Sequence, residues 1–213
     1  MIKGILFDMD GTLIDSEEMH TMSLIDAIKE KMGIEIQKSE IEKYVGLRYI
    51  EKLKRIFQDD REDLLEIANL GAEKNGRYLN LVKEIPGVRG MLRKLKKNFK
   101  LGLVTASNKN QAEVLLDLVG IKKYFDVILT SEDVKRNKPN PEPYLLASKK
   151  LGLNPEECVV VEDSETGLES GKRAGMKCIL IKHKYNGGQD FSRADIILED
   201  RNKITPELIK SLG

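Results

Sequence analysis

The spacing of apolar positions divides the chain into three parts. Residues 4–7 form a short apolar run, and from Ser16 to about Leu81 apolar side chains recur at spacings of three and four. After Pro86-Gly87, short runs of consecutive apolar residues alternate with segments in which apolar residues have helical spacing. Spacings of three and four predict helices, whereas uniformly apolar runs predict strands that are buried on both faces. We therefore expect an α/β protein whose first strand is followed by a wholly helical insert.

The alternating part predicts a doubly wound parallel sheet, because strands that alternate with helices are joined by right-handed crossovers. Beyond the opening strand, the expected strands are residues 101–105, 127–130, 158–161, 178–181 and 194–198, and the expected helices are residues 88–98, 109–119, 141–151, 164–174 and 205–212. A helical insert within such a chain is typical of a separate small domain. We expect a catalytic core of residues 1–15 and 82–213 and an all-helical cap, or lid, of residues 16–81.

Composition predicts a globular protein without nucleic-acid or membrane partners. The 213 residues are 40% hydrophobic, and the charged side chains nearly cancel to a net charge of +1, which gives no attraction to nucleic acid or an anionic membrane. No apolar run approaches the roughly 20 residues of a membrane span, and none resembles a signal peptide. Cys158 and Cys178 adjoin apolar runs and are expected to be buried thiols. We expect a cytoplasmic monomer or small homo-oligomer.

Candidate chemistry begins where the first strand ends, at Asp8 and Asp10. Side chains alternate along a strand, so both carboxylates leave the chain on the same side. They repel each other unless a cation binds them, and a small cation that takes oxygen ligands and a phosphate is Mg²⁺. A calcium loop is disfavoured, because Gly11 comes too early and Met19 stands where that loop needs Glu. A strand-end turn, in which Asp binds backbone donors, is the structural alternative.

Polar residues also follow later apolar runs, at the edge where a parallel sheet binds its ligands. The hydroxyl of Thr105 and the backbone N–H groups of the turn from Ala106 onward can hold phosphate oxygens. Glu162 and Asp163 can complete a metal site with Asp8. Helix capping is the alternative for the acidic pair and for the residues after Thr105. A lysine in a proline-rich loop, such as Lys138, is ordinarily a solvated surface charge.

These segments resemble, in order, the four motifs of the haloacid dehalogenase-like (HAD) superfamily. The matching segments are Asp8-Met9-Asp10-Gly11-Thr12-Leu13, Thr105, Lys138-Pro139 and Glu162-Asp163-Ser164-Glu165-Thr166-Gly167. The presence of Asp10 points to the phosphatase and phosphomutase branch. The resemblance implies a nucleophilic Asp8, a general acid/base Asp10, and a Mg²⁺ held by Asp8, the backbone carbonyl of Asp10, Asp163 and, directly or through water, Glu162. It also implies that Thr105, Ala106 and Lys138 bind the phosphoryl group.

The helical insert resembles the small cap of β-phosphoglucomutase-like HAD proteins. His20 matches the hinge segment of that group, and Lys74 resembles its cap lysine. In Val45-Gly46-Leu47-Arg48-Tyr49, the arginine stands one residue earlier than in the mutase pattern. These three side chains, His20, Arg48 and Lys74, are candidate substrate contacts.

The motifs together predict a Mg²⁺-dependent phosphatase of small phosphorylated metabolites, with sugar phosphates as the first class to test. The expected route is an aspartyl-phosphate at Asp8. A β-phosphoglucomutase-like isomerase is the alternative, because the same site would become a mutase if a sugar hydroxyl replaced water. A non-catalytic phosphate-sensing or interaction module is an alternative of another class.

Overall fold

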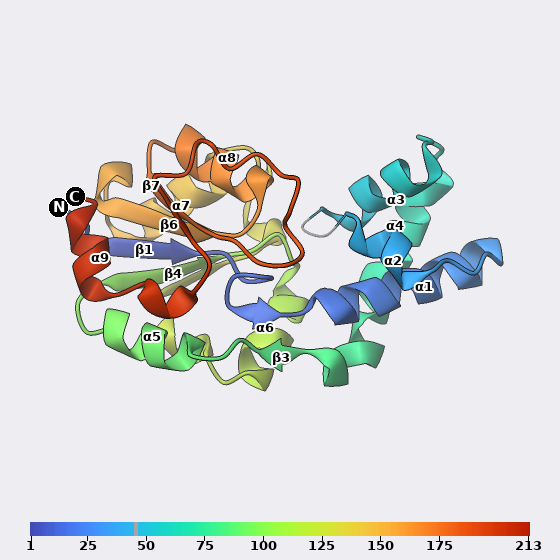
Figure 1. The fold of residues 1–213 in the computed structure, drawn as a ribbon, viewed down its shortest axis with the longest axis horizontal. Helices are drawn as coiled ribbons and strands as arrows, with labels where there is room; N and C mark the ends of the chain where they lie inside the picture. Colours follow the sequence, from blue (N-terminus) through green and yellow to red (C-terminus); the bar gives the residue numbers. More distant parts are fainter. Residues whose placement is uncertain (45–46) are drawn as a thin grey trace. The chain divides into compact units, whose positions relative to one another are not determined.

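The computed structural model describes residues 1–44 and 47–213, which form two compact units. The sheet unit comprises Met1–Ile14 and Glu84–Gly213, and the helical unit comprises Asp15–Lys83. Where the chain passes between them, two short strands, β2 (Ile14–Asp15) and β3 (Lys83–Glu84), pair with each other (Figure 1). Strands of two residues are too short to leave a periodic pattern, so the sequence does not predict them.

The described part of the sheet unit contains a six-stranded parallel sheet with the order β5-β4-β1-β6-β7-β8. Its strands are β1 (Gly4–Phe7), β4 (Lys100–Val104), β5 (Val127–Leu129), β6 (Cys158–Glu162), β7 (Lys177–Ile181) and β8 (Ile196–Leu198). The order reverses at β1, since β4 and β5 extend the sheet to one side and β6 to β8 extend it to the other. In such sheets ligands bind outside the carboxyl ends of the strands at the reversal. The predicted doubly wound α/β fold is confirmed.

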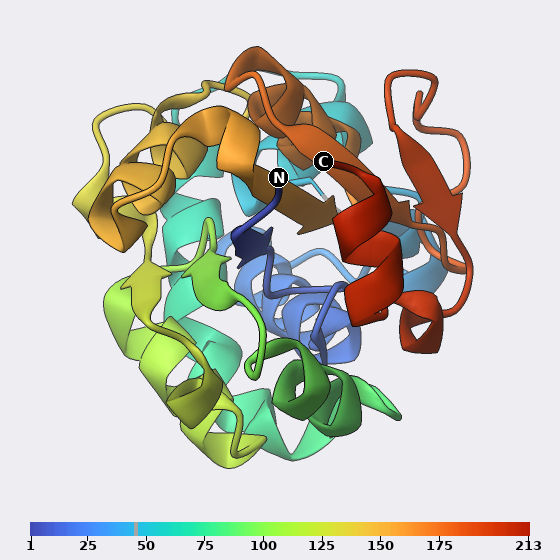
Figure 2. The same cartoon turned by 90° about the vertical axis from the view of Figure 1, so that its left-hand side faces the viewer.

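Helices cover both faces of this sheet (Figures 1 and 2). One face carries α7 (Glu142–Leu151) and α8 (Glu165–Arg173), and the other carries α5 (Val88–Leu95), α6 (Lys109–Leu118) and α9 (Pro206–Ser211). The connections hold short 3-10 helices, η2 (Lys122–Tyr124), η3 (Ser131–Asp133), η4 (Pro155–Glu157) and η5 (Arg201–Lys203). Every residue of β6 is buried, as expected for a strand that lies between two helical layers.

Element ends differ from the sequence prediction where local hydrogen bonds intervene. The helix expected over residues 88–98 ends at Leu95, whose carbonyl accepts the N–H groups of both Asn98 and Phe99 in a closing turn. The strand expected over residues 194–198 begins only at Ile196. Asp195 still contacts the neighbouring strand: its N–H donates to the Cys178 carbonyl over 3.0 Å, and its carboxylate accepts the N–H of Cys178 over 2.8 Å.

The helical unit has a hydrophobic core of its own. It consists of α1 (Glu17–Met32), α2 (Lys38–Glu42), α3 (Tyr49–Phe57), α4 (Asp63–Lys74) and the 3-10 helix η1 (Asn75–Leu81). Leu24 and Ile28 of α1 pack with Leu53 of α3 and with Leu64 and Ile67 of α4. These are positions of the three- and four-residue spacing, so the predicted helical insert between the first strand and the rest of the sheet is confirmed.

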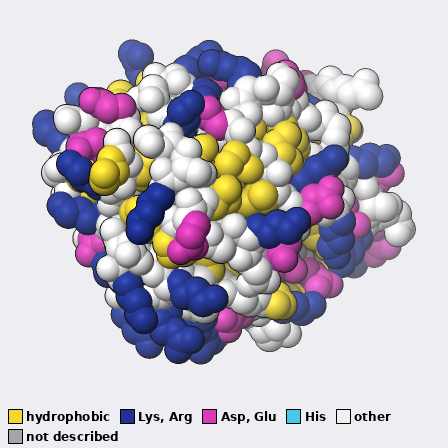
Figure 3. Space-filling view, turned by 60° about the vertical axis from the view of Figure 1, so that its left-hand side comes forward, with side chains coloured by type: hydrophobic (Ala, Val, Ile, Leu, Met, Phe, Trp, Pro, Cys, Tyr) yellow, Lys and Arg dark blue, Asp and Glu magenta, His cyan; other side chains and the backbone are white. Residues whose placement is uncertain are grey.

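The surface mixes both signs of charge, in keeping with the net charge of +1. On the face drawn in Figure 3, Lys and Arg side chains are interspersed with Asp and Glu side chains around a group of hydrophobic ones. None of the described helices is long and apolar enough to cross a membrane. Cys158 and Cys178 are free and buried, as predicted, and burial raises the pKa of each thiol to about 12.

Candidate active site

Asp8 and Lys138 form a buried ion pair at the carboxyl end of β1. Asp8 directly follows that strand, and its Oδ1 accepts a hydrogen bond of 2.6 Å from Lys138 Nζ. The same ammonium donates to the Val104 carbonyl at the end of β4, over 2.9 Å, and to Glu162 Oε1 at the end of β6, over 2.6 Å. It therefore joins the ends of three adjacent strands. With its side chain only 7% exposed, Lys138 is not a solvated surface charge.

The carboxylate of Glu162 is fully engaged by hydrogen bonds. Its Oε1 accepts from Lys138 and from the Tyr144 hydroxyl at 2.9 Å. Its Oε2 accepts the N–H of Asp163 at 3.0 Å and both the N–H and the hydroxyl of Ser164, at 3.1 and 3.0 Å. Burial raises the pKa of Glu162, but Lys138 and these donors outweigh it and hold the pKa below its ordinary value. Burial also raises the pKa of Tyr144 well above its ordinary value, so its hydroxyl keeps its proton.

Asp163 is held from two sides. Its Oδ1 accepts a hydrogen bond of 3.1 Å from the Thr12 hydroxyl, and its Oδ2 lies 2.9 Å from His183 Nε2. Gly11 has a φ of +76°, and a Cβ there would overlap the Asp163 carboxylate, so the turn after β1 needs glycine at this point. Burial raises the pKa of Asp163, and the hydrogen bond with His183 partly offsets this effect.

Asp8, Glu162 and Asp163 form an acidic cluster. Among the described residues, each offers a carboxylate oxygen, and these oxygens lie within 4.8 Å of one another. Burial raises the pKa of Asp8 well above its ordinary value; Lys138 opposes the rise, and repulsion from the other two acids adds to it. Burial would lower the pKa of Lys138, but Asp8 and Glu162 outweigh it and raise that pKa. Three buried carboxylates around one ammonium leave an excess of negative charge, which a cation would neutralise.

The chemistry of this donor set fits a hard divalent cation. Carboxylate oxygens are the ligands that Mg²⁺ takes, and Mg²⁺ tolerates a site with few protein ligands because it keeps bound waters. A carboxylate oxygen has two lone pairs. The contacts of Asp8 with Lys138, and of Asp163 with Thr12 and His183, leave several of these lone pairs for a metal. Glu162 has none to spare, since its donors occupy both oxygens. A metal or a metal-bound water would reach it only by displacing one of these donors.

Asp10 faces the end of β4. Its Oδ2 accepts hydrogen bonds from the hydroxyls of Ser107, over 3.1 Å, and Thr105, over 3.5 Å. The N–H of Ser107 in turn donates to the Thr105 hydroxyl over 3.0 Å, in a tight turn around Ala106. Ser107 therefore contacts the candidate acid/base. The cap of α6 is Asn108, whose side chain accepts the N–H of the third helical residue over 2.8 Å.

The three candidate substrate contacts in the helical unit differ in their surroundings. His20 Nδ1 lies 2.8 Å from the Tyr49 hydroxyl. Arg48 is exposed and pairs with the acid three residues later, over 2.7 Å, at the start of α3. Lys74 is buried and pairs with two acids of α1, over 2.6 and 3.1 Å, which is sufficient to explain a lysine there. The adjoining motif residues Val45-Gly46 lie outside the described residues.

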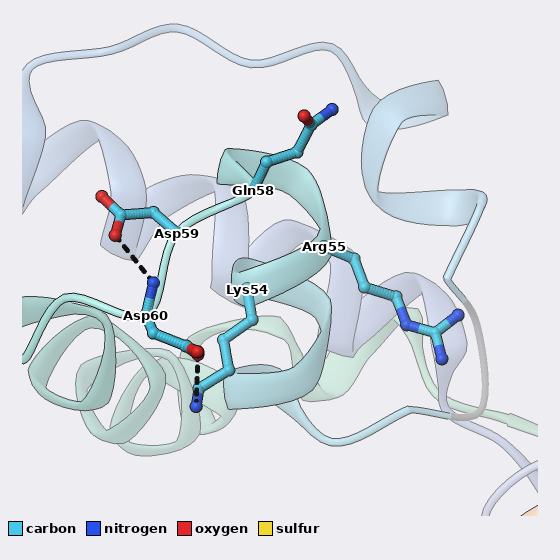
Figure 4. Close-up of a pocket in the computed structure, with 5 residues that line it drawn as sticks. All are labelled: Lys54, Arg55, Gln58, Asp59 and Asp60. Atoms are coloured by element: carbon cyan, nitrogen blue, oxygen red, sulfur yellow. Dashed lines mark hydrogen bonds and ion pairs between the residues drawn. The ribbon is translucent and has the colours of Figure 1, made fainter.

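A shallow pocket in the helical unit has a different character (Figure 4). It has a volume of about 280 Å³ and lies at the end of α3. The lining residues are all exposed: Lys54, Arg55, Gln58, Asp59 and Asp60. Lys54 pairs with Asp60 over 2.7 Å, and Arg55 points away from the others. The pocket holds no buried acid or base, so it is a weaker candidate for catalysis than the acidic cluster.

Several residues of the site escape sequence reasoning. Tyr144 falls at a core position of α7, where an apolar side chain would be expected, and only the structure reveals its hydroxyl on Glu162. Arg201, far along the chain, donates to the carbonyl oxygens of Gly11 and Thr12. His183 could have been identified from the sequence, because it closely follows the strand β7 and ligands bind at the carboxyl ends of parallel strands.

The doubly wound sheet and the acidic cluster at its reversal point place the protein among α/β enzymes with a carboxylate-rich site. Residues 5–181 match the model of the haloacid dehalogenase-like hydrolases, and the chain belongs to this family. The match begins within β1 and ends with β7, so it includes every acid of the cluster.

Several relatives are similar to this protein over nearly the whole chain. The phosphorylated carbohydrates phosphatase of Thermotoga maritima is 33% identical over 201 residues, which cover 92% of this chain and 93% of the relative. The pyrophosphatase PpaX of Bacillus velezensis is 31% identical over 201 residues, which cover 93% and 92%. The crystal structure of a β-phosphoglucomutase from Clostridium difficile superposes with a TM-score of 0.79 at 26% identity, covering 100% and 97%. The predicted resemblance to β-phosphoglucomutase-like HAD proteins is confirmed.

Proposed function

We propose that the protein is a Mg²⁺-dependent phosphatase that hydrolyses small phosphorylated metabolites, sugar phosphates first among them, through an aspartyl-phosphate at Asp8. The observation that carries the proposal is the buried Asp8–Lys138 pair, with Asp163 beside it, at the reversal point of the sheet. A carboxylate in such a place can attack phosphorus, because the neighbouring ammonium balances the charge of an anionic substrate.

The metal would complete this site. Asp8 and Asp163 would hold Mg²⁺, together with the backbone carbonyl of Asp10, and Glu162 would contribute its negative charge from beside them. When bound, it supplies positive charge to the phosphoryl oxygens and to the nucleophile.

In the first half-reaction, an oxygen of Asp8 attacks phosphorus and the bond from phosphorus to the ester oxygen breaks. Asp10 gives its proton to that oxygen, and the alcohol leaves. Lys138 stays fixed between its acceptors and serves as a point charge for the phosphoryl oxygens. The Thr105 hydroxyl and the N–H of Ala106 are the remaining donors for those oxygens. The Thr105 hydroxyl has a single proton, so it gives up its contact with Asp10 when it donates to a phosphoryl oxygen.

In the second half-reaction, Asp10 takes a proton from water, which attacks the aspartyl-phosphate at phosphorus. The bond between phosphorus and the Asp8 oxygen breaks, and inorganic phosphate is released with the carboxylate restored. The hydroxyl contact from Ser107 keeps Asp10 oriented between the two steps. A proton donor and acceptor at this position serves catalysis and has no use in a binding module, which speaks against the non-catalytic alternative.

The substrate class rests on similarity, since one relative is named for phosphorylated carbohydrates and another for pyrophosphate. Within the helical unit, His20 is the best candidate for a substrate contact, because Lys74 is buried in ion pairs and Arg48 pairs with a neighbouring acid. We propose that small phosphorylated metabolites are the molecules that bind this site.

Phosphate release across a panel of sugar phosphates, phosphoglycolate and pyrophosphate, with and without Mg²⁺, tests the proposal. Asp8→Asn should lose at least about 10³-fold in rate, because an amide cannot form the acyl phosphate. Asp117→Asn, an exposed acid on α6, is the matched control and should keep full activity. Release that persists in Asp8→Asn, or that needs no divalent cation, would contradict the mechanism.

A β-phosphoglucomutase-like isomerase is the second candidate, favoured by the structural likeness to such an enzyme and by His20 in the helical unit. A sugar hydroxyl would replace water in the second half-reaction. Conversion of β-glucose 1-phosphate to glucose 6-phosphate in the presence of a bisphosphate primer, faster than phosphate release, would support this candidate over the phosphatase.

A further inference from the structure

His183 touches the acidic cluster but has no part in the chemistry proposed above. It follows β7 by two residues, and its side chain is 15% exposed beside Asp163. The distance from its Nε2 to Asp163 Oδ2 is 2.9 Å. It lies outside all four sequence motifs, so its role has to be derived from its contacts.

The surrounding hydrogen bonds fix the direction of this contact. His183 Nδ1 accepts the backbone N–H of Tyr185 over 3.3 Å. A neutral imidazole carries one ring proton, so an accepting Nδ1 requires the proton on Nε2. Nε2 is therefore the donor and Asp163 Oδ2 the acceptor. The Tyr185 ring meets the imidazole edge-on, with ring centres 6.2 Å apart, and restrains its plane.

A buried asparagine fixes the loop that carries the histidine. Asn186 is 2% exposed, and its Oδ1 accepts the N–H of His183 over 3.0 Å. Its Nδ2 donates to the carbonyl oxygens of Asp163 and Ile181, each over 2.8 Å. One side chain thus ties the backbone of His183 to the backbone of Asp163, so the imidazole and the carboxylate keep a constant relative position.

The carboxylate of Asp163 is in this way held at both oxygens. Thr12 donates to Oδ1 from the turn after β1, and His183 donates to Oδ2 from the loop after β7. A carboxylate with one donor on each oxygen cannot rotate without breaking a hydrogen bond. Each oxygen still keeps a second lone pair.

We propose that His183 is a positioning residue that presets Asp163 as a metal ligand. The proposal rests on the metal site of the proposed function. Hydrogen bonds to metal ligands from the surrounding protein fix ligand orientation, and loss of one typically costs about 10–100-fold in metal affinity. Without His183, the Asp163 side chain would have to be ordered when the metal binds, and the lost freedom would weaken binding.

Isothermal titration of the intact protein with Mg²⁺ tests this role without relying on catalysis. The variants are His183→Ala, which removes the donor, and His183→Gln, whose amide N–H can reach the position of Nε2. Lys182→Gln is the matched control, because Lys182 is the exposed neighbour of His183 in the same loop. We expect His183→Ala to bind Mg²⁺ about 10–100-fold more weakly, and the other two variants to stay within about threefold of the wild type.

Three results would overturn the proposal. Wild-type affinity in His183→Ala would show that the hydrogen bond does not position Asp163. Binding by His183→Gln as weak as that by His183→Ala would assign the effect to ring packing. A wild-type protein that binds no Mg²⁺ would refute the metal site itself, and with it this role, which distinguishes failure of the proposed function from failure of the inference alone.

Discussion

Lys138→Met tests how much the stability of the sheet unit depends on one buried charge. Methionine is unbranched and apolar, so the substitution removes the ammonium while keeping a long side chain in place. Asp8 and Glu162 would then face each other within 4.8 Å without their shared counter-ion. The Val104 carbonyl would also lose its donor. Neither acid is exposed enough for water to replace these contacts.

The expected loss of stability follows from this geometry. Removing one partner of a buried ion pair costs about 3–5 kcal/mol, because an uncompensated charge stays behind. In a chain of this length each kcal/mol lowers Tm by about 2–4 °C. We therefore expect Tm to fall by about 6–20 °C near neutral pH when a chelator removes divalent cations.

The loss of stability in Lys138→Met should be larger at high pH than at low pH. Lys138 holds the pKa of Glu162 below its ordinary value, so the stability from this carboxylate is present above the unfolded pKa and is lost as the pH falls through the folded one. Without Lys138 the pKa values of Asp8 and Glu162 both rise, and protonation relieves their repulsion. The difference in Tm between wild type and Lys138→Met should therefore be largest near pH 8 and should narrow toward pH 4.

Thermal unfolding followed by circular dichroism at pH 4, 6 and 8, in the presence of a chelator, measures this difference. Lys96→Met is the matched control, because it breaks an exposed ion pair with Asp126, and such pairs contribute at most about 1 kcal/mol. If Lys138→Met melts no lower than the control, or if its deficit is the same at pH 4 and pH 8, the reasoning is refuted.

Further outcomes are open to measurement. Tyr144→Phe removes the hydroxyl on the Glu162 carboxylate and should lower the free energy of unfolding by about 1.5–3 kcal/mol in urea titrations; an unchanged midpoint would contradict the contact. Burial raises the pKa of Asp195, but Lys172 and the Cys178 N–H outweigh it and hold that pKa below its ordinary value. Asp195→Asn should therefore destabilise the protein at pH 7, and the destabilisation should disappear as the pH falls through the lowered pKa of Asp195. Mg²⁺ at 100 times its Kd should stabilise the wild type by about 2.7 kcal/mol, and a chelator should remove the gain.

The fold and the strand-end acids could be predicted from the sequence because both follow local rules. Uniformly apolar runs such as Val159-Val160-Val161 are buried on both faces, and their carboxyl ends meet at one edge of a parallel sheet. Asp8 and Asp163 therefore had to approach each other once the strand order was known. The helical insert followed from its spacing alone, and spaced positions such as Ile28, Leu53 and Ile67 lie in its core.

The contacts that tune the site could not be predicted, since they join residues far apart in sequence. No local pattern relates Tyr144 to Glu162 or Arg201 to the turn after β1. The role of Glu162 is a further example. The sequence offers it as a metal ligand, whereas the structure surrounds it with donors, a property that depends on the complete packing around one carboxylate.

The pairing of β2 with β3 allows the inserted helical unit to be exchanged for another segment in evolution. The helical unit begins and ends in hydrogen-bonded neighbouring strands, so its two ends lie about 5 Å apart. Any segment whose ends meet at that spacing could take its place without altering the order of the sheet. The acidic cluster and Lys138 belong wholly to the sheet unit. Under the proposed function, a different inserted segment could therefore give a different substrate preference. The residues that transfer the phosphoryl group would stay the same.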